Sequence, residues 1–518
     1  MNMRSAFNAI FWLSTVSVAA TRRQYGHSAP TAVTKNGTYV GRYEPAYDTD
    51  YFLGMPYAQP PVGPLRFHTP VSLNSTFGER NATEYGPECF GYGLDTVSQG
   101  NYVSEDCLTS GLVMGGSADN RYNQSFIVQQ SCEAGMPILA VSINYRLSSW
   151  GGDPTRVTIQ GESSGGTSVG AQLLAYNGRD DKLFSGAIAE SGAPVGLTPY
   201  PTVQTWEPII ANLSAAVGCS SSGDVLSCFR SVPTDQMNAA INSSVTSGAQ
   251  YGPVVDGDFI VDQAETQLER GDFVHVPYII GANSDEGTGF GPRQVNTTQQ
   301  FLSWMTSQGI DNATAQDMAI LYPDIPEIGI PASFPGRPNE TFGLQFKRSS
   351  AAAGDVSMHA PRRLTASLWA ARNSTVYTYR FNVIPNGISW AYGAVHFQEV
   401  AFVFYNTMGL GYPQNGNPNP LGGVFREEYL RVAKLMTRMW ISFVNYGDPN
   451  QHLGVDAQVW PAYTLDAPQN FVFEQNVSSH AEADTYRAEG IHYIENFILA
   501  RAGGICSGLV ACGASDVD

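Results

Sequence analysis

The pattern of apolar and polar positions along the chain predicts β-strands that alternate with α-helices. Four short apolar runs have the composition of strands: residues 138–144, 157–160, 276–281 and 376–381. The first is a continuous apolar run, which is typical of a strand buried on both faces of a parallel sheet. Helices are predicted at 166–176, which contains no proline, and at 429–445, where apolar residues recur at helical spacing. This alternation indicates an α/β fold.

The first twenty residues have a different pattern. A basic residue precedes an apolar run over 6–20, which ends with Val18 and Ala20 at the small-residue positions of a cleavage site. A run of fifteen residues is too short to span a bilayer. We interpret 1–20 as a secretory signal peptide and 21–518 as one mature domain, and the alternative is a buried N-terminal helix.

The net charge and the glycosylation sequons of the chain limit which partners it can bind and indicate in which cellular compartment it is found. The chain has 518 residues, of which 28 are Lys or Arg and 46 are Asp or Glu, so its formal net charge is −18. Such a polyanion repels nucleic acids and anionic lipids, and we expect neither as a partner. Asn-x-Ser/Thr sequons, which fit a secreted, extracellular glycoprotein, begin at eleven positions: Asn36, Asn74, Asn81, Asn123, Asn212, Asn242, Asn296, Asn312, Asn339, Asn373 and Asn476.

The cysteines suggest disulfide bonds rather than a metal site. Seven are present, at 89, 107, 132, 219, 228, 506 and 512. In an oxidising compartment the short separations favour the pairs 89 with 107, 219 with 228 and 506 with 512, which leaves Cys132 unpaired. The chain contains no CxxC, HExxH or Gly-Lys sequence, so zinc, metalloprotease and P-loop chemistry lack their residues, and we expect no metal.

A candidate nucleophile lies between the predicted strand 157–160 and the predicted helix 166–176. Gly161-Glu-Ser-Ser-Gly165 is a GxSxG sequence, which on a sharp strand-to-helix turn exposes the serine hydroxyl above a sheet. We expect that a Cβ at either glycine would collide with the neighbouring chain. Ser163 is therefore the candidate nucleophile, and the alternative is an ordinary glycine-rich turn.

A serine nucleophile needs a histidine base, which a carboxylate orients. In an α/β fold of this kind the acid and then the histidine follow the serine along the chain. Five histidines lie far enough downstream: 359, 396, 452, 480 and 492. His396 is favoured because it ends a turn-like segment before the apolar run 400–404. Asp285 and Glu286 both follow a predicted strand, so spacing leaves the choice of acid open.

Ordered motifs along most of the chain resemble the type B carboxylesterase and lipase family, which includes fungal lipases and cholinesterases. The matching runs are 36–39 (NGTY), 52–63 (FLGMPYAQPPVG), 65–67 (LRF), 104–108 (SEDCL), 144–151 (NYRLSSWG), 151–154 (GGDP), 161–165 (GESSG), 190–192 (ESG), 284–287 (SDEG), 440–443 (WISF) and 447–450 (GDPN). The resemblance implies an α/β-hydrolase fold with a mostly parallel central sheet and helices on both faces.

The resemblance also implies roles for individual residues. Ser163 is the expected nucleophile, His396 the general base and Glu286, rather than Asp285, the acid. The family's disulfides match Cys89 with Cys107 and Cys219 with Cys228. Arg66 and Glu105 match a buried ion pair, and Ser191 matches a residue that supports the acid by a hydrogen bond, although a buried core serine is an equal interpretation.

The chain departs from the family pattern at two places. The family has two further strands and a glycine-rich oxyanion turn after the run 104–108, whereas here Leu108 is followed directly by 109–116. Gly111 stands at the last glycine of that turn, so the expected oxyanion donors are the N–H groups of Ser164 and Gly111. A parallel crossover to the next strand needs about a dozen residues or more, usually in a helix, and over 145–156 Gly151, Gly152 and Pro154 oppose a helix. We infer two internal deletions.

The sequence thus predicts a secreted carboxylic ester hydrolase, an esterase or lipase that uses a Ser-His-Glu triad, an acyl-enzyme intermediate and no cofactor. Its expected partner is a small-molecule or lipid ester. Only 17 residues separate Cys89 from Cys107, and such a short loop favours an esterase over a lipase with a lid. The alternatives are a non-catalytic binding member of the family, like the neuroligin-like adhesion proteins, and a serine peptidase.

Overall fold

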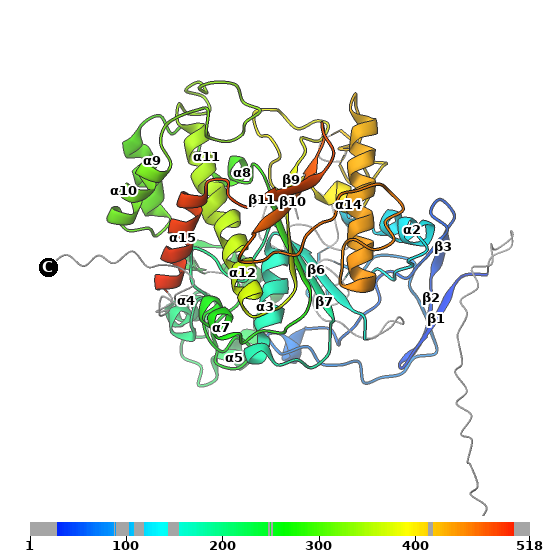
Figure 1. Ribbon diagram of the computed structural model, residues 1–518. Coiled ribbons are helices and arrows are strands. Elements are labelled where there is room, and N and C mark those ends of the chain that lie inside the picture. Colours follow the sequence, from blue (N-terminus) through cyan, green and yellow to red (C-terminus); the bar gives the residue numbers. More distant parts are fainter. Residues whose placement is uncertain are drawn as a thin grey trace, which may run out of the picture.

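A six-stranded sheet forms the centre of the molecule (Figure 1). The computed structural model describes residues 28–87, 89, 103–107, 119–142, 155–246, 249, 252–412 and 418–501. In spatial order the strands are β11 (His480–Ala483), β10 (Gln469–Glu474), β9 (Val376–Asn382), β8 (Tyr278–Asn283), β7 (Gly186–Glu190) and β6 (Thr158–Glu162). All neighbours are parallel except the antiparallel pair of β10 and β11. The sheet is therefore mostly parallel.

Helices cover both faces of this sheet. Side chains alternate along β8, so that Tyr278 and Ile280 join one buried cluster while Ile279 joins the other. The first cluster is formed with α3 (Ser164–Gly178), α7 (Ala264–Arg270), α12 (Ala360–Ala371) and α15 (Ala488–Arg501). The second is formed with α2 (Ser125–Glu133), α13 (Val400–Val403) and α14 (Arg426–Tyr446), on the opposite side of the sheet in Figure 1. An apolar layer thus lies on each face, as the α/β prediction requires.

The remaining elements surround this core. The helical ones are η1 (Gly63–Leu65), η2 (Asn120–Tyr122), α4 (Val203–Ala216), α5 (Val225–Ser231), α6 (Thr234–Ile241), η3 (Ser244–Thr246), α8 (Gly287–Phe290), α9 (Thr298–Ser307), α10 (Asn312–Leu321), α11 (Phe346–Gly354) and the π-helical turn η4 (Asp355–His359). Near the N-terminus, β1 (Thr31–Thr34), β2 (Gly37–Val40) and β5 (Glu79–Asn81) form one small sheet, and β3 (Arg42–Glu44) and β4 (Thr49–Tyr51) form another.

Most of the elements predicted from the sequence are confirmed. The runs 157–160, 276–281 and 376–381 lie within or overlap β6, β8 and β9, and the two predicted helices are α3 and α14. Helix α14 is longer than predicted, and the residue that follows its end, Gly447, takes the left-handed conformation at φ 67°. None of the described helices is both long enough and apolar enough to cross a lipid bilayer.

The prediction of a strand at 138–144 is wrong for its described part. Residues 138–142 form no strand, and Leu139 and Val141 are 63% and 42% exposed. Among the described residues β6 pairs with β7 alone, so the sheet ends there. The physical reason lies in the connection from this run to β6, where Gly151, Gly152 and Pro154 oppose the crossover helix that usually joins parallel neighbours. Residues 143–154 lie outside the described part.

A disulfide and an ion pair lie within the N-terminal segment, and Arg66 connects this segment to α5. Cys89 is bonded to Cys107, and Cys219 to Cys228, as predicted, while Cys132 is a free, exposed thiol. Arg66 Nη2 lies 2.9 Å from Glu105 Oε2. Arg66 Nη1 also donates to the carbonyl of Phe229 in α5 at 3.0 Å. Residues 1–20, Gly111 and the cysteines at 506 and 512 lie outside the described residues.

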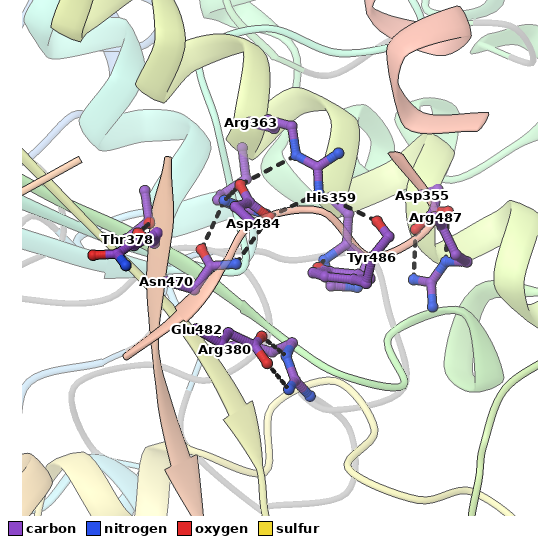
Figure 2. Close-up of polar contacts among 12 residues, drawn as sticks. Asp355, His359, Arg363, Thr378, Arg380, Asn470, Glu482, Asp484, Tyr486 and Arg487 are labelled. Carbon is purple, nitrogen blue, oxygen red and sulfur yellow. Dashed lines mark hydrogen bonds and ion pairs between the residues drawn. The ribbon is translucent and has the colours of Figure 1, made fainter. Parts of the chain in front are cut away.

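A buried polar network attaches the C-terminal hairpin to α12 (Figure 2). The carboxylate of Asp484, which follows β11, accepts hydrogen bonds from Arg362 Nη1 at 2.6 Å and from Arg363 Nη2 at 2.7 Å. Nearby, Arg380 of β9 pairs with Glu482 of β11 at 2.7 Å. These contacts join residues about one hundred positions apart and hold the last two strands against the core.

Candidate active site

Ser163 occupies a strained turn between β6 and α3. Its backbone has φ 59° and ψ −121°, a conformation that non-glycine residues rarely adopt. The Ser163 N–H donates to the carbonyl of Glu190, at the end of β7, at 2.8 Å. The turn thus presents the hydroxyl at the carboxyl edge of the sheet, where active sites of open α/β folds gather.

Glycines make room for this turn, although not both of those expected. A Cβ on Gly161 would lie 2.3 Å from the backbone of Gly165, so that part of the prediction is right. A Cβ on Gly165 would meet no described atom within 4 Å, so the expected collision there is wrong. The second crowded position is instead Gly192, whose added Cβ would lie 2.3 Å from the carbonyl oxygen of Ser163. The signal for Gly192 was the run 190–192.

Three side chains from separate strand ends form one chain of hydrogen bonds. His396 Nε2 lies 2.9 Å from Ser163 Oγ, and His396 Nδ1 lies 2.7 Å from Glu286 Oε2. Ser163 follows β6, Glu286 follows β8 and His396 lies on the connection from β9 to α13. Glu286 is fully buried, while 17% of the His396 side chain is exposed. The hydroxyl, the imidazole and the carboxylate therefore have the geometry of a nucleophile, its base and an orienting acid.

The structure separates the two acids between which sequence spacing could not decide. Glu286 Oε1 accepts hydrogen bonds from Ser191 Oγ at 2.6 Å and from the N–H of Asn283 at 2.8 Å. Asp285 instead turns toward the loop before His396, and its Oδ2 accepts the N–H of Ala394 at 2.8 Å. Glu286 thus contacts the imidazole, whereas Asp285 contacts the backbone that carries it.

Three further buried carboxyl groups surround the histidine, and the sequence analysis did not identify them. Glu162 and Glu190 are paired in register at the ends of β6 and β7, and Glu399 precedes α13. Glu162 Oε1 lies 3.3 Å from His396 Nε2. Glu190 Oε1 accepts from Trp440 Nε1 and Gln160 Nε2, and Glu399 Oε2 accepts from Asn283 Nδ2. A signal existed for two of them, because Glu162 lies inside the GxSxG sequence and Glu190 begins the run 190–192.

Burial and mutual repulsion shift the protonation equilibria of these groups. Burial, with a smaller contribution from the Glu399 charge, raises the pKa of Glu190 to about 8. Burial and the charge of Glu286 raise the pKa of Glu399 to about 7. Burial lowers the pKa of His396, but the Glu286 carboxylate and then Glu162 outweigh it, and the pKa is raised to about 10. The site therefore stabilises a positively charged imidazolium.

A cavity of about 340 Å³ opens beside the serine. It is lined by Ser163, Ser164, Thr167, Ser191, Gly192, Ala193, Pro194, Val195, Gly196, Thr198, Tyr200, Ser357 and Met358. The candidate oxyanion residue Ser164 is thus in the cavity wall. Among the residues that the structure describes, no group of three His, Cys, Asp or Glu side chains is arranged to hold a metal ion.

Comparison with known proteins identifies the family. Residues 28–151 and 143–492 match the sequence model of the Carboxylesterase family. Lipase 1 of Geotrichum candidum is 27% identical over an alignment that covers 94% of this chain and 98% of that protein. Lipase 4 of Diutina rugosa is 30% identical, with 67% of this chain and 77% of that protein covered. The crystal structure of Aspergillus niger EstA superposes with a TM-score of 0.75 and 24% identity, covering 92% of this chain and 99% of that one.

The mostly parallel sheet with helices on both faces is therefore an α/β-hydrolase fold. The chain belongs to the carboxylesterase family, and this match together with its lipase relatives indicates carboxylic ester hydrolase activity. The family match also bears on the inferred deletions, because its two segments share residues 143–151, where the second deletion is expected. The alignment with Lipase 1 spans 591 positions and is longer than this chain, so some of its positions have no residue here.

Proposed function

We propose that this protein is a secreted serine esterase that hydrolyses carboxylic esters through an acyl-enzyme on Ser163. The observation that carries the proposal is the hydrogen-bonded chain from Ser163 through His396 to the buried Glu286. A serine hydroxyl is a weak nucleophile near neutral pH, and a histidine within hydrogen-bond distance is the usual means of activating it.

The proposed reaction has two halves. As Ser163 Oγ attacks the ester carbonyl, His396 Nε2 takes its proton, and Glu286 stabilises the imidazolium. His396 then gives the proton to the departing alcohol, which leaves an acyl group on Ser163. In the second half His396 deprotonates a water molecule whose oxygen attacks the acyl carbon, and the imidazolium then returns the proton to Ser163 Oγ as the bond to the acyl group breaks and the acid is released. The N–H of Ser164 is the proposed oxyanion donor, with that of Gly111 as the second.

The cavity beside Ser163 supports an esterase rather than a lipase of long-chain esters. Its volume of about 340 Å³ lies near the lower end of the usual range for ligand sites. Serine, threonine and tyrosine side chains interrupt its apolar lining. We therefore propose a soluble ester with a small acyl group as substrate, and turnover of p-nitrophenyl esters of increasing chain length measures this preference.

Secretion of the chain is proposed from its N-terminus and its cysteines. The expected signal peptide at 1–20 predicts a single mature domain that begins at Thr21 or close by. Both described disulfides suit an oxidising compartment. One relative, 27% identical, is named Secreted lipase 1 of Botryotinia fuckeliana. N-terminal sequencing of protein from the culture medium tests this, and Met1 on that material would contradict it.

A fluorophosphonate probe tests the proposed nucleophile. We expect wild-type protein to be labelled on the peptide that contains Ser163, and Ser163→Ala to lose both labelling and p-nitrophenyl butyrate turnover. Ser168→Ala is the matched control, because Ser168 lies on the same helix with its hydroxyl donating to the Ser164 carbonyl at 2.8 Å. Absence of labelling in folded wild-type protein would favour a non-catalytic binding protein. Faster cleavage of amides than of matched esters would favour a peptidase.

A further inference from the structure

Phe397 directly follows the proposed base and has an unfavourable backbone conformation. Its φ is 76°, in the left-handed region, which a large side chain adopts only where surrounding contacts hold it. The residue lies between His396 and Glu399, which precedes α13. Relaxation of this one backbone angle would reorient the peptide that carries His396. Something must therefore hold Phe397 in place.

The aromatic ring of Phe397 makes contacts that can hold this strained backbone conformation in place. It packs edge-to-face on Tyr122, with ring centroids 5.7 Å apart and an angle of 89°. The Arg121 guanidinium lies 4.7 Å from its centroid, within the range of a cation–π interaction. Tyr122 also packs edge-to-face on Phe404, just after α13. The ring thus joins the histidine loop to η2, and Tyr122 in turn joins η2 to Phe404 after α13.

The Arg121 guanidinium, against which the Phe397 ring packs, is itself held in place by Asp119. Asp119 Oδ2 accepts a hydrogen bond from Arg121 Nε at 2.8 Å, and Asp119 Oδ1 accepts the N–H of Arg121 at 2.9 Å. Arg121 and Asp119 are both buried. A Cβ on Gly411 would lie 2.6 Å from the backbone nitrogen of Arg121, so the chain at Gly411 packs closely against this ion pair. Because the ion pair is desolvated and closely packed, the guanidinium offers the ring a rigid surface.

The other end of the histidine loop is held by a different residue. Asp285 Oδ2 accepts the Ala394 N–H at 2.8 Å, and the Asp285 N–H donates to the Ala394 carbonyl at 3.0 Å. A Cβ on Gly393 would lie 2.1 Å from Asp285 Oδ2, so the contact is close. The backbone before His396 is therefore held by the hydrogen bonds of Asp285, and the backbone after it by the ring contacts of Phe397.

We infer that Phe397 is a positioning residue, whose ring contacts hold a strained turn and thereby keep the His396 imidazole directed at Ser163. The inference rests on the proposed function, since it concerns the geometry of the proposed base. Phe397 does not line the cavity beside Ser163. Its replacement should therefore change kcat and leave KM almost unchanged.

Three replacements of Phe397 distinguish the effect of its ring contacts from the effect of its strained backbone. Phe397→Ala removes the ring contacts but leaves a residue that is strained at positive φ, so the turn relaxes and kcat falls by about 10- to 100-fold, as expected for a misplaced catalytic group. Phe397→Gly removes the ring but also the strain, because glycine adopts positive φ freely, and should retain kcat within about threefold of wild type. Phe397→Tyr keeps the ring and should resemble wild type. A purely structural role predicts the opposite order, with glycine worse than alanine.

Tyr176 provides a matched control at the far end of α3. It too has positive φ, 53°, with the Arg179 guanidinium 4.3 Å from its centroid and the ring of Phe259 edge-to-face at 5.4 Å. Tyr176→Ala removes the same kinds of contact without touching the histidine loop. We expect an unchanged kcat, whatever the change in melting temperature.

Steady-state kinetics and melting temperatures of all variants decide the inference. A kcat for Phe397→Ala equal to that of wild type, or for Phe397→Gly no higher than that of Phe397→Ala, would overturn it. If Phe397→Ala does not fold, Phe397→Leu takes its place, because leucine is also strained at positive φ and lacks the ring. Labelling of wild-type Ser163 by the fluorophosphonate is measured first. Failure of that step refutes the proposed function, whereas successful labelling with unaffected variants refutes only the role of Phe397.

Discussion

Adjacent residues at the end of β8 have different tasks. Glu286 directs a carboxylate oxygen to the imidazole at 2.7 Å, while the carboxylate of Asp285 binds the backbone of Ala394. Glu286 has two further donors that hold its other oxygen in place, from Ser191 and Asn283. Because only Glu286 can fix the imidazole tautomer and stabilise its charge, the two acids should respond differently to amide substitution.

Exchange of each acid for its amide tests this difference. Glu286→Gln should lower kcat by about 10⁴-fold, since an amide cannot stabilise the imidazolium and favours the wrong tautomer. Asp285→Asn should lower kcat by about tenfold, because it acts only through the position of the loop. Turnover of p-nitrophenyl butyrate by the two variants is compared, provided that their melting temperatures are equal. Equal losses for the two variants would show that the acid is misassigned.

The charge state of His396 governs the expected pH dependence. Carboxylates around the ring raise the pKa of His396 to about 10, with Glu286 contributing more than Glu162. A base must be neutral to accept a proton, so the active fraction grows as the pH rises toward this pKa. The effect on folding has the opposite sign. A raised histidine pKa stabilises the folded protein fully below about 6.5, and this stabilisation is lost as the pH rises through about 10.

We therefore predict that kcat/KM continues to rise with pH above about 6.5, the ordinary pKa of a histidine side chain. Glu162→Gln removes one carboxylate beside Nε2, so the inflection should move to lower pH. Glu265→Gln is the matched control, since burial raises the pKa of Glu265 to about 7 at a position on α7 outside the site. An inflection that stays in place or moves upward in Glu162→Gln would contradict the prediction.

Among the elements, the C-terminal hairpin depends most on buried charge. Burial alone would raise the pKa of Asp484, but the guanidiniums of Arg362 and Arg363 outweigh it and hold the pKa well below its usual range. The carboxylate also accepts a hydrogen bond from Asn470 Nδ2 at 2.9 Å. Its contribution to stability is present above the unfolded pKa of about 3.9 and is lost only as the pH falls toward the depressed folded value.

Removal of this charge should destabilise the fold strongly. Asp484→Asn leaves two buried guanidiniums without a counter-ion, and we expect the free energy of unfolding to fall by about 3–5 kcal/mol. Asp181→Asn is the matched control, because Asp181 receives a similar bidentate pair from Arg179 at 2.7 Å, but on the exposed surface. Urea denaturation measures both. A loss for Asp484→Asn no greater than that of the control would refute the role assigned to the network.

For the molecule as a whole, the inferred gaps affect the edge of the sheet at β6. The nucleophile follows β6 directly, and within the described residues that strand has a neighbour on one side only. The exposed Leu139 and Val141 belong to the run expected to pair there. An unpaired buried backbone group costs about 1–3 kcal/mol, and a domain is stable by only about 5–15 kcal/mol. A few such groups would remove much of that stability.

We predict that filling the two inferred gaps improves the enzyme. A chain with family segments inserted after Leu108 and near Gly151 should exceed the 518-residue chain either in soluble yield or, by about two orders of magnitude or more, in p-nitrophenyl butyrate turnover. The reason is that the first insertion restores two strands and an oxyanion donor, whereas the second restores a crossover helix before β6. Similar yield and turnover for the two chains would show that the fold tolerates the gaps.

Features encoded by neighbouring residues could be predicted from the sequence. The GxSxG turn, helices α3 and α14, strands β6, β8 and β9 and the short-range cystines all depend on local periodicity, turn residues or short loops. His396 could be selected as the base from its turn-like context and from the family resemblance. The choice of Glu286 over Asp285 came from that resemblance alone, since neighbouring residues have the same spacing.

Tertiary structure alone decided how distant residues meet. His396 lies 233 positions from Ser163 and 110 from Glu286, and the contact distances follow from strand order and register rather than from any local pattern. The same register brings Glu162 and Glu190 together, and the anchoring of Phe397 depends on a loop 276 positions earlier in the chain. The run at 138–142 shows the converse, because an apolar pattern becomes a buried strand only where the chain leaves it a neighbour to pair with.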